Sequence, residues 1–222
     1  MRKVMVVAPH PDDETLGCGG TLLKHRSNGD EIHWLIITSI EDLSSVDESI
    51  KEKRRNEIEE VAKKYKFTSL NELNYETASL DRQPLKEIIS SIFSVFQKVK
   101  PDIIYIPYMF DPHSDHRIIY DASIAASKSF RSPFISSIRV YQTLSETEFS
   151  AEMGEGGFKP SLFIDITNWM EKKLEIMRLY ESEFGNHPFP RSEKNIIAQA
   201  TLCGSSANCE YAEGFIVVRE IA

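Results

Sequence analysis

Short runs of β-branched and apolar residues alternate along this chain with segments that have helical periodicity. The runs at 4–8, 31–38 and 102–107 are almost continuously apolar, which is typical of strands buried on both faces. Amphipathic spacing separates them and is clearest at 84–99. Strands that alternate with helices form right-handed βαβ units. We therefore expect an α/β fold, a Rossmann-like three-layer sandwich with a mostly parallel central sheet.

The remaining expected elements are shorter or less regular. Further helices are predicted at 14–26, 49–65, 115–129, 168–181 and 195–204, and further strands at 138–141, 162–166 and 215–219. Residues 69–75 are expected to form a loop that leads into a short strand. Residues 143–159 are rich in Glu, Ser and Gly, which indicates either a surface loop or a lid over a substrate site. We expect one domain that spans residues 1–222.

Charge and composition narrow the functional class. The net charge of −8 argues against a nucleic-acid partner. Three cysteines without paired spacing do not predict a disulfide framework. The apolar run at the N-terminus is too short for a signal peptide or a membrane span. We therefore expect a cytoplasmic protein, without a membrane span, that acts on a small molecule, and a homo-oligomer is compatible with the sequence.

The sequence Pro-His-Pro-Asp-Asp-Glu at 9–14 directly follows the first predicted strand. Ligands of open α/β sheets bind at the carboxyl ends of strands. His10 and Asp13 are three residues apart across a turn held by proline, so both can face one site. Adjacent carboxylates repel one another unless a cation neutralises them. A simpler interpretation is acidic capping of a helix N-terminus, which explains one or two carboxylates but not the histidine or the prolines.

A second polar cluster follows the predicted strand at 102–107. Two histidines and two acids occur within Asp-Pro-His-Ser-Asp-His at 111–116. His113 and His116 share a face if the helix has begun there. Because both clusters follow strands of one sheet, we expect them to meet in one crevice. Two imidazoles and one carboxylate with an open coordination position suit catalytic zinc, although Fe²⁺ also favours this set.

The two motifs carry a resemblance to a known family. PHPDDE after an apolar strand, paired with HSDH at 113–116, resembles the PIG-L/LmbE-like family of zinc-dependent N-deacetylases. The similarity extends to Arg-x-x-Glu at 54–57 and to Tyr-Ala-Glu-Gly-Phe at 211–215. The resemblance implies that zinc is bound by three residues: His10, Asp13 and His116. It implies an LmbE-like fold and removal of an acetyl group from an N-acetylglucosaminyl-type conjugate or a related small amide.

The resemblance also implies roles for the neighbouring polar residues. Asp12 would be the general base that activates the zinc-bound water, and His113 would stabilise the oxyanion and protonate the leaving amine. Asp115 would orient His113 and stabilise its charge. Arg54 is the expected substrate anchor, with a solvated helix charge as the alternative, and the sequence does not decide between Arg54 and Arg55. Glu14 would bind a substrate hydroxyl or orient a metal ligand.

Other functions remain open at this point. The same residues suit a metal-dependent amidase, a phosphoesterase or another hydrolase that acts on a non-sugar compound. A non-catalytic metal-binding protein is the remaining alternative, although such a protein has no need of Asp12. The identity of the N-acylated substrate is not encoded in these motifs, because substrate choice depends on loops.

Overall fold

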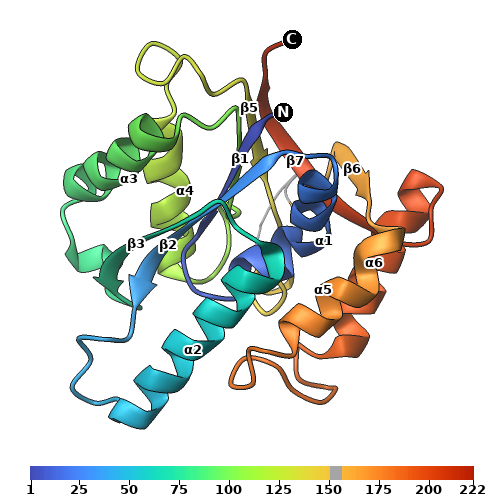
Figure 1. The fold of residues 1–222 in the computed structure, drawn as a ribbon, viewed down its shortest axis with the longest axis horizontal. Helices are drawn as coiled ribbons and strands as arrows, with labels where there is room; N and C mark the ends of the chain where they lie inside the picture. Colours follow the sequence, from blue (N-terminus) through green and yellow to red (C-terminus); the bar gives the residue numbers. More distant parts are fainter. Residues whose placement is uncertain (151–156) are drawn as a thin grey trace.

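A computed structural model describes residues 1–150 and 157–222 and shows one twisted sheet covered on both faces by helices (Figure 1). The expected three-layer α/β architecture is confirmed. Seven strands lie in the order β3-β2-β1-β4-β5-β7-β6. All neighbouring pairs are parallel except those of β7, which runs antiparallel to both β5 and β6. The strands are β1 (Lys3–Ala8), β2 (Glu31–Ser39), β3 (Ser69–Glu76), β4 (Ile103–Ile106), β5 (Ser137–Val140), β6 (Leu162–Asp165) and β7 (Ala212–Glu220).

Six α-helices connect the strands within the described residues. They are α1 (Asp13–Ser27), α2 (Glu48–Tyr65), α3 (Leu85–Val99), α4 (Ser114–Ala126), α5 (Met170–Met177) and α6 (Glu193–Ala207). Short 3₁₀ turns occur at Leu80–Arg82, Thr147–Phe149 and Thr167–Trp169. The last of these replaces the first turn of the helix expected at 168–181. None of the described helices is long and apolar enough to cross a lipid bilayer.

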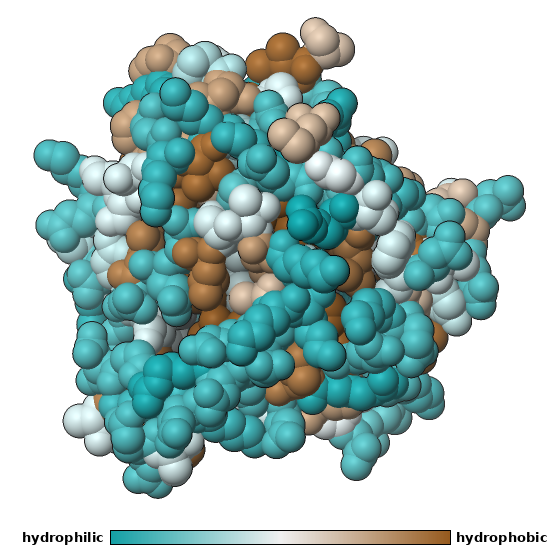
Figure 2. Space-filling model, in the orientation of Figure 1, coloured by the Kyte–Doolittle hydropathy of each residue, from teal (hydrophilic) through white to brown (hydrophobic). Residues whose placement is uncertain are grey.

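The alternation of side chains along β1 creates two separate cores. Val4, Val6 and Ala8 pack with α1, α2, α5 and α6 on one face of the sheet. Met5 and Val7 pack with α3 and α4 on the other face. All five side chains are fully buried, which explains the continuous apolar run in the sequence. Figure 2 shows that polar side chains cover most of the outer surface, with apolar side chains exposed in separate patches.

Residues 69–76 form a full strand, so the loop expected at 69–75 is wrong. Its burial pattern alternates between more buried and exposed residues, because β3 lies at the edge of the sheet and pairs only with β2. The many Asn and Glu side chains of this segment obscured its strand character. Tertiary pairing with β2 outweighs the weak local β-propensity of these residues.

The strand order reverses direction between β1 and β4. Sheet growth proceeds from β1 through β2 to β3 on one side, and from β4 to β5 on the other. β1 and β4 are parallel neighbours, with Val4, Met5 and Val6 opposite Ile103, Ile104 and Tyr105. Such a switch point leaves a crevice at the carboxyl ends of the two strands. The segments 9–14 and 111–116 both leave the sheet at this point.

Candidate metal and active site

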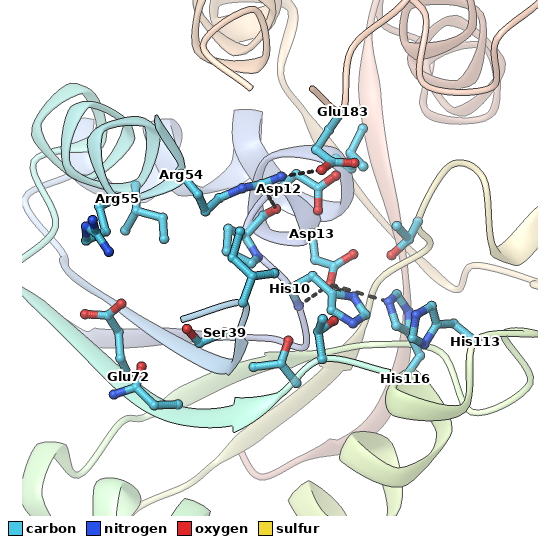
Figure 3. Close-up of a pocket in the computed structure, with 18 of the residues that line it drawn as sticks. His10, Asp12, Asp13, Ser39, Arg54, Arg55, Glu72, His113, His116 and Glu183 are labelled. Atoms are coloured by element: carbon cyan, nitrogen blue, oxygen red, sulfur yellow. Dashed lines mark hydrogen bonds and ion pairs between the residues drawn. The ribbon is translucent and has the colours of Figure 1, made fainter. Parts of the chain in front are cut away.

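The two polar clusters meet at the crevice between β1 and β4 (Figure 3). Oδ2 of Asp13 lies 3.5 Å from Nδ1 of His10 and 3.4 Å from Nε2 of His116. The donor atoms of these three residues all lie within 4.8 Å of one another. The main-chain N–H of His10 also donates to Oδ2 of Asp13 at 2.8 Å, which fixes the turn between them. The structure therefore brings together the three residues expected to bind the metal.

Each of the two candidate histidine ligands is held from behind by a carboxylate. Nδ1 of His116 lies 2.8 Å from Oδ2 of Asp111, and Nε2 of His10 lies 3.0 Å from Oδ2 of Asp115. Metal-binding histidines commonly hydrogen-bond a carboxylate through the nitrogen that does not face the metal. With Nδ1 of His10 and Nε2 of His116 directed towards Asp13, the donor set fits a divalent metal ion.

A second group of potential donors shares one residue with the first. His10, His113 and Asp115 also place donor atoms within 4.8 Å of one another. This group is less suited to a metal, because Nδ1 of His113 already accepts a hydrogen bond from the main-chain N–H of Asp115 at 3.2 Å. The carboxylate of Asp115 is likewise occupied. We therefore assign the candidate metal site to the first group.

The Asp115 carboxylate contacts His10, and not His113 as expected. The carboxylate accepts hydrogen bonds from the main-chain N–H groups of Ala78 and Leu80 and lies against His10. His113 is the N-cap residue of α4, so its ring turns back towards the first N–H groups of the helix. The interaction of Asp115 with His113 therefore runs through the main chain, and its side chain orients His10.

Electrostatics favour a cation at the centre of this cluster. Burial opposes ionisation of His10, but its hydrogen bonds to Asp115 and Asp13 raise its pKa to about 9. Burial likewise acts against His116, and the charges of Asp13 and Asp111 raise its pKa to about 10. Burial alone would raise the pKa of Asp13, yet the two histidines lower it below its ordinary range. Without a metal, protons on the histidines balance the buried carboxylates.

Asp12 stands beside the candidate metal site in a strained backbone conformation. Its φ of 121° lies outside the regions that non-glycine residues normally adopt. The side chain is 7% exposed, and the residue lines the cavity. Burial, followed by the neighbouring charge of Asp13, raises the pKa of the Asp12 carboxyl well above its ordinary value. A carboxyl in this environment takes up a proton more readily than a solvated one.

Glu14 lies beneath the site and is not among the residues that line the cavity, so its expected contact with a substrate hydroxyl is not supported. The residue is fully buried. Its carboxylate accepts hydrogen bonds from the Tyr180 hydroxyl at 2.9 Å, from the Thr15 hydroxyl at 2.5 Å and from the main-chain N–H of Asp12 at 3.1 Å. Glu14 thus holds the strained backbone of Asp12, and its expected role in orienting a metal ligand stays a prediction.

Arg54 lines the cavity but is already occupied by the protein. Its side chain is 16% exposed, so it is not a solvated helix charge. The guanidinium forms an ion pair with Glu183, lies 3.4 Å from Glu57 and donates to the main-chain oxygen of Pro11 at 3.2 Å. Arg55 points instead to Glu41 and Glu48. Arg54 therefore supports the turn that carries Asp12.

Three further residues of the site were given no role there from the sequence. Arg191 places Nε 3.9 Å from Oδ2 of Asp12 and is fixed by Glu183 at 2.8 Å. Asp111 orients His116, as described above. Asp111 lies within the second motif, and its role could have been inferred from the need of a metal-binding histidine for a carboxylate partner. Arg191 and Glu183 lie outside both motifs, and no local signal identifies them.

The site opens into a cavity of about 650 Å³. Thr143, Ser145 and Glu146 contribute to its wall. Arg191 donates to the Ser145 hydroxyl at 2.8 Å and so links two loops beside the cavity. The first part of the segment at 143–159, for which a surface loop and a lid were both expected, therefore contributes to the wall of the cavity. Residues 151–156 lie outside the described residues.

A buried ion pair supports the helix that follows Asp12. α1 is kinked at Cys18, where φ is −148° and ψ is 24°. Nζ of Lys173 donates to the main-chain oxygen of Leu16 at 2.9 Å, and the Glu213 carboxylate accepts from the N–H groups of Gly20 and Thr21. Lys173 and Glu213 meet at 2.7 Å with side chains that are 2% and 4% exposed. Glu213 thus caps the second half of α1 and does not reach the cavity.

Fold and site together define an α/β protein with a candidate metal site at the switch point of its sheet. Residues 5–127 match the family described as GlcNAc-PI de-N-acetylase, or PIG-L. This match covers both motifs and more than half of the chain. The protein belongs to the PIG-L family, as its sequence motifs predict.

Similar proteins extend the match over the whole chain. A diacetylchitobiose deacetylase of Thermococcus kodakarensis is 25% identical over 96% of this chain and 82% of its own length. The N,N′-diacetylchitobiose deacetylase of Pyrococcus horikoshii, solved with an inhibitor, is 26% identical, with a TM-score of 0.79 over 98% of this chain and 84% of that one. The conserved protein TT1542 of Thermus thermophilus shares the fold, with a TM-score of 0.80, 23% identity and coverage of 100% and 97%.

Proposed function

We propose that this protein is a zinc-dependent deacetylase that removes the acetyl group from the amide nitrogen of an N-acetylglucosaminyl-type sugar conjugate. Its family and its deacetylase relatives place it among hydrolases of amide C–N bonds. One observation carries the proposal. The Asp13 carboxylate lies between His10 and His116, and Asp12 lines the same cavity beside it. A ligand set and a general base thus occur together, as amide hydrolysis requires.

The proposed metal ligands are His10, Asp13 and His116. Two imidazole nitrogens and one carboxylate suit zinc, and Fe²⁺ is the alternative that these donors also accept. When bound, a zinc ion supplies Lewis acidity to the acetamide carbonyl and to water. Asp111 and Asp115 would hold the two imidazoles in the tautomers that this binding needs.

We assign the general base to Asp12. Its carboxyl is buried, and burial raises its pKa, so it is a stronger base than a solvated aspartate. The hydrogen bond from its own N–H to Glu14 fixes the strained turn that directs it. In the proposed reaction Asp12 accepts a proton from the attacking water while a C–O bond forms at the acetyl carbon.

We assign stabilisation of the oxyanion to His113. Its Nδ1 accepts the main-chain N–H of Asp115, so the neutral ring carries its proton on Nε2. In the metal-free protein, burial and then the charges of His10 and His116 lower the pKa of His113 to about 4. A bound divalent cation would replace the charges of those two rings, so the ring of His113 is neutral before the reaction. A neutral ring donates Nε2–H to the developing oxyanion. We propose that the amine leaves with this proton when the C–N bond breaks, and that the proton which Asp12 took from water returns to the ring of His113 through solvent, so that acetate, free amine and both side chains in their starting states result.

Release of acetate tests this function. Zinc-loaded protein is offered N-acetylated monosaccharides, N,N′-diacetylchitobiose and small non-sugar amides, and acetate and free amine are measured together. We expect equimolar acetate and amine from the sugar substrates. The Asp12→Ala variant should bind zinc and lose at least about 100-fold in kcat, whereas His116→Ala should lose the metal. Turnover of the non-sugar amides alone would replace the proposed substrate with an amide of another class.

A further inference from the structure

The cavity extends well beyond the candidate metal site. A second region lies between α2 and the carboxyl ends of β2 and β3, and we call it the distal arm. Its floor includes Ile58 and Leu70, and polar residues at its edge include Glu41, Arg55 and Glu72. In Figure 3, Arg55 and Glu72 lie on the far side of Ser39 from His113 and His116. An apolar floor with a polar edge suits a sugar ring, which has both C–H faces and hydroxyl groups.

The charges that line the cavity are unbalanced. Among the described lining residues there are seven carboxylates and three arginines, and no lysine. The carboxylates are Asp12, Asp13, Glu41, Glu59, Glu72, Glu146 and Glu183. A bound divalent metal would offset the charge near Asp13 but lies at the other end from the distal arm. The field in the distal arm therefore attracts cations and repels anions.

Each of the three arginines is already paired with carboxylates. Arg191 binds Glu183 at 2.8 Å, and Arg54 pairs with Glu183 and Glu57. Arg55 binds Glu48 at 2.7 Å and also pairs with Glu41. A phosphate or carboxylate on the substrate would have to break one of these pairs to gain a bidentate partner. The described lining thus offers no ready site for an anionic group.

Glu72 is the carboxylate of the distal arm that no cation offsets. It lies on β3 opposite Ile36 of β2, and it has no ion pair within the described part of the chain. The other two each have a cation beside them, since Glu41 pairs with Arg55 and Glu59 lies 3.6 Å from Lys63. Partial burial, and then the charge of Glu41, raise the pKa of Glu72. A positive group nearby acts in the opposite direction, because it favours the ionised form of the carboxyl.

We infer that the distal arm binds an uncharged or positively charged sugar unit attached to the N-acetylated sugar, and that Glu72 selects against anionic units there. This inference rests on the proposed function, because it names the second part of that substrate. On this inference the protein binds conjugates whose second unit is an amino sugar or a neutral sugar more tightly than conjugates that carry phosphate or a uronic acid.

Three disaccharides test the inference. Each has N-acetylglucosamine as the unit to be deacetylated, and the second unit is glucosamine, glucose or glucuronic acid. Dissociation constants are measured by calorimetry on zinc-loaded Asp12→Asn protein, so that the disaccharides are not hydrolysed. We expect the glucosamine compound to bind about tenfold or more tightly than the glucuronic acid compound, with the glucose compound between them.

Variants of Glu72 locate the selectivity. Glu72→Lys in the same background should reduce the preference for the cationic compound at least about tenfold, and Glu72→Gln should give an intermediate value. Glu87→Lys makes the same charge change on α3 and outside the cavity, so it should leave the preference unchanged. Equal binding of the anionic and neutral compounds, an unchanged preference in Glu72→Lys, or no binding of any compound would overturn the inference.

A separate measurement distinguishes the two proposals. Acetate release from the same three compounds is followed with the wild-type zinc-loaded protein. If the order of binding holds but no acetate appears, the proposed deacetylation is wrong and the selectivity of the distal arm stands. If acetate appears from all three at equal kcat/KM and they bind equally, the deacetylase assignment stands and the inference on Glu72 is wrong.

Discussion

Asp111 holds His116 from behind, with Oδ2 of Asp111 2.8 Å from Nδ1 of His116 and both side chains at most 1% exposed. The contact leaves Nε2 of His116 directed towards Asp13, 3.4 Å away. Asp111 also accepts a hydrogen bond from the Thr147 hydroxyl, so its own orientation is fixed. The ring of His116 is therefore oriented for a metal before any metal binds.

Replacement of Asp111 with Asn should weaken metal binding without removing a ligand. The amide carries no charge and is a weaker acceptor for the imidazole N–H, so we expect the affinity for zinc to fall about 10- to 100-fold. Competition with a chelating dye measures this change. Asp121→Asn is the matched control, because it removes the same charge from an exposed position on α4. Equal affinities of Asp111→Asn and the wild type would contradict the orienting role.

Metal binding should release protons near neutral pH. In the metal-free protein, buried carboxylates raise the pKa of His10 to about 9 and that of His116 to about 10, against the opposing effect of burial. Both rings are therefore protonated at pH 7 and must lose their protons to bind zinc. We expect release of about two protons per zinc ion, and an affinity that rises with pH until these groups have titrated. Calorimetry of zinc binding in buffers of different ionisation enthalpy counts the released protons. A binding enthalpy that does not depend on the buffer would show that His10 and His116 are not protonated in the metal-free protein.

Much of this site could be predicted because its chemistry lies in two contiguous motifs that follow neighbouring strands. The pairing of β1 with β4 brings His10, Asp13 and His116 together. This grouping can be anticipated once the two strands are expected to be neighbours. The direction of individual side chains could not be predicted. Asp115 binds His10 instead of His113 because the N-cap geometry of α4 turns the ring of His113 towards the main chain.

Other features depend on partners that are distant in sequence. Glu14 is buried against Tyr180, and Arg54 pairs with Glu183, although more than a hundred residues separate the members of each pair. β3 was expected to be mostly loop because its polar residues have low strand propensity, yet pairing with β2 forms a full strand. Such interactions arise only when the chain has folded, so no local pattern reveals them.

The contribution of His25 to the stability of the fold should decrease as the pH falls below neutrality. This ring hydrogen-bonds Asp30 at 2.8 Å and the Tyr105 hydroxyl at 3.0 Å, and burial lowers its pKa below the ordinary value of 6.5. The unfolded chain then binds more protons than the folded one. The stabilising contribution of His25 is complete above about pH 6.5. It is lost as the pH falls from there through the pKa of His25 in the folded state.

Urea unfolding between pH 8 and pH 5 measures this contribution. His25→Gln should reduce the loss of unfolding free energy on acidification, by at most about 1.4 kcal/mol per pH unit. Arg26→Gln is the control, because it replaces an exposed neighbour of His25 in α1 and leaves the buried imidazole in place. If the wild type and His25→Gln lost stability in parallel, the buried ring would not be the origin of the pH dependence.

The kink in α1 should depend on the ion pair between Lys173 and Glu213. Lys173→Met leaves the buried Glu213 carboxylate with its two N–H donors but without its countercharge, which we expect to cost about 3 kcal/mol of unfolding free energy. Lys172→Met, on the same helix with an exposed surface ion pair, should change stability by less than about 1 kcal/mol. The double variant Lys173→Met/Glu213→Gln removes the unpaired charge and should be more stable than Lys173→Met alone. If the loss of unfolding free energy in the double variant equalled the sum of the losses in Lys173→Met and Glu213→Gln, the two side chains would stabilise α1 independently, and the proposed dependence on the pair would be wrong.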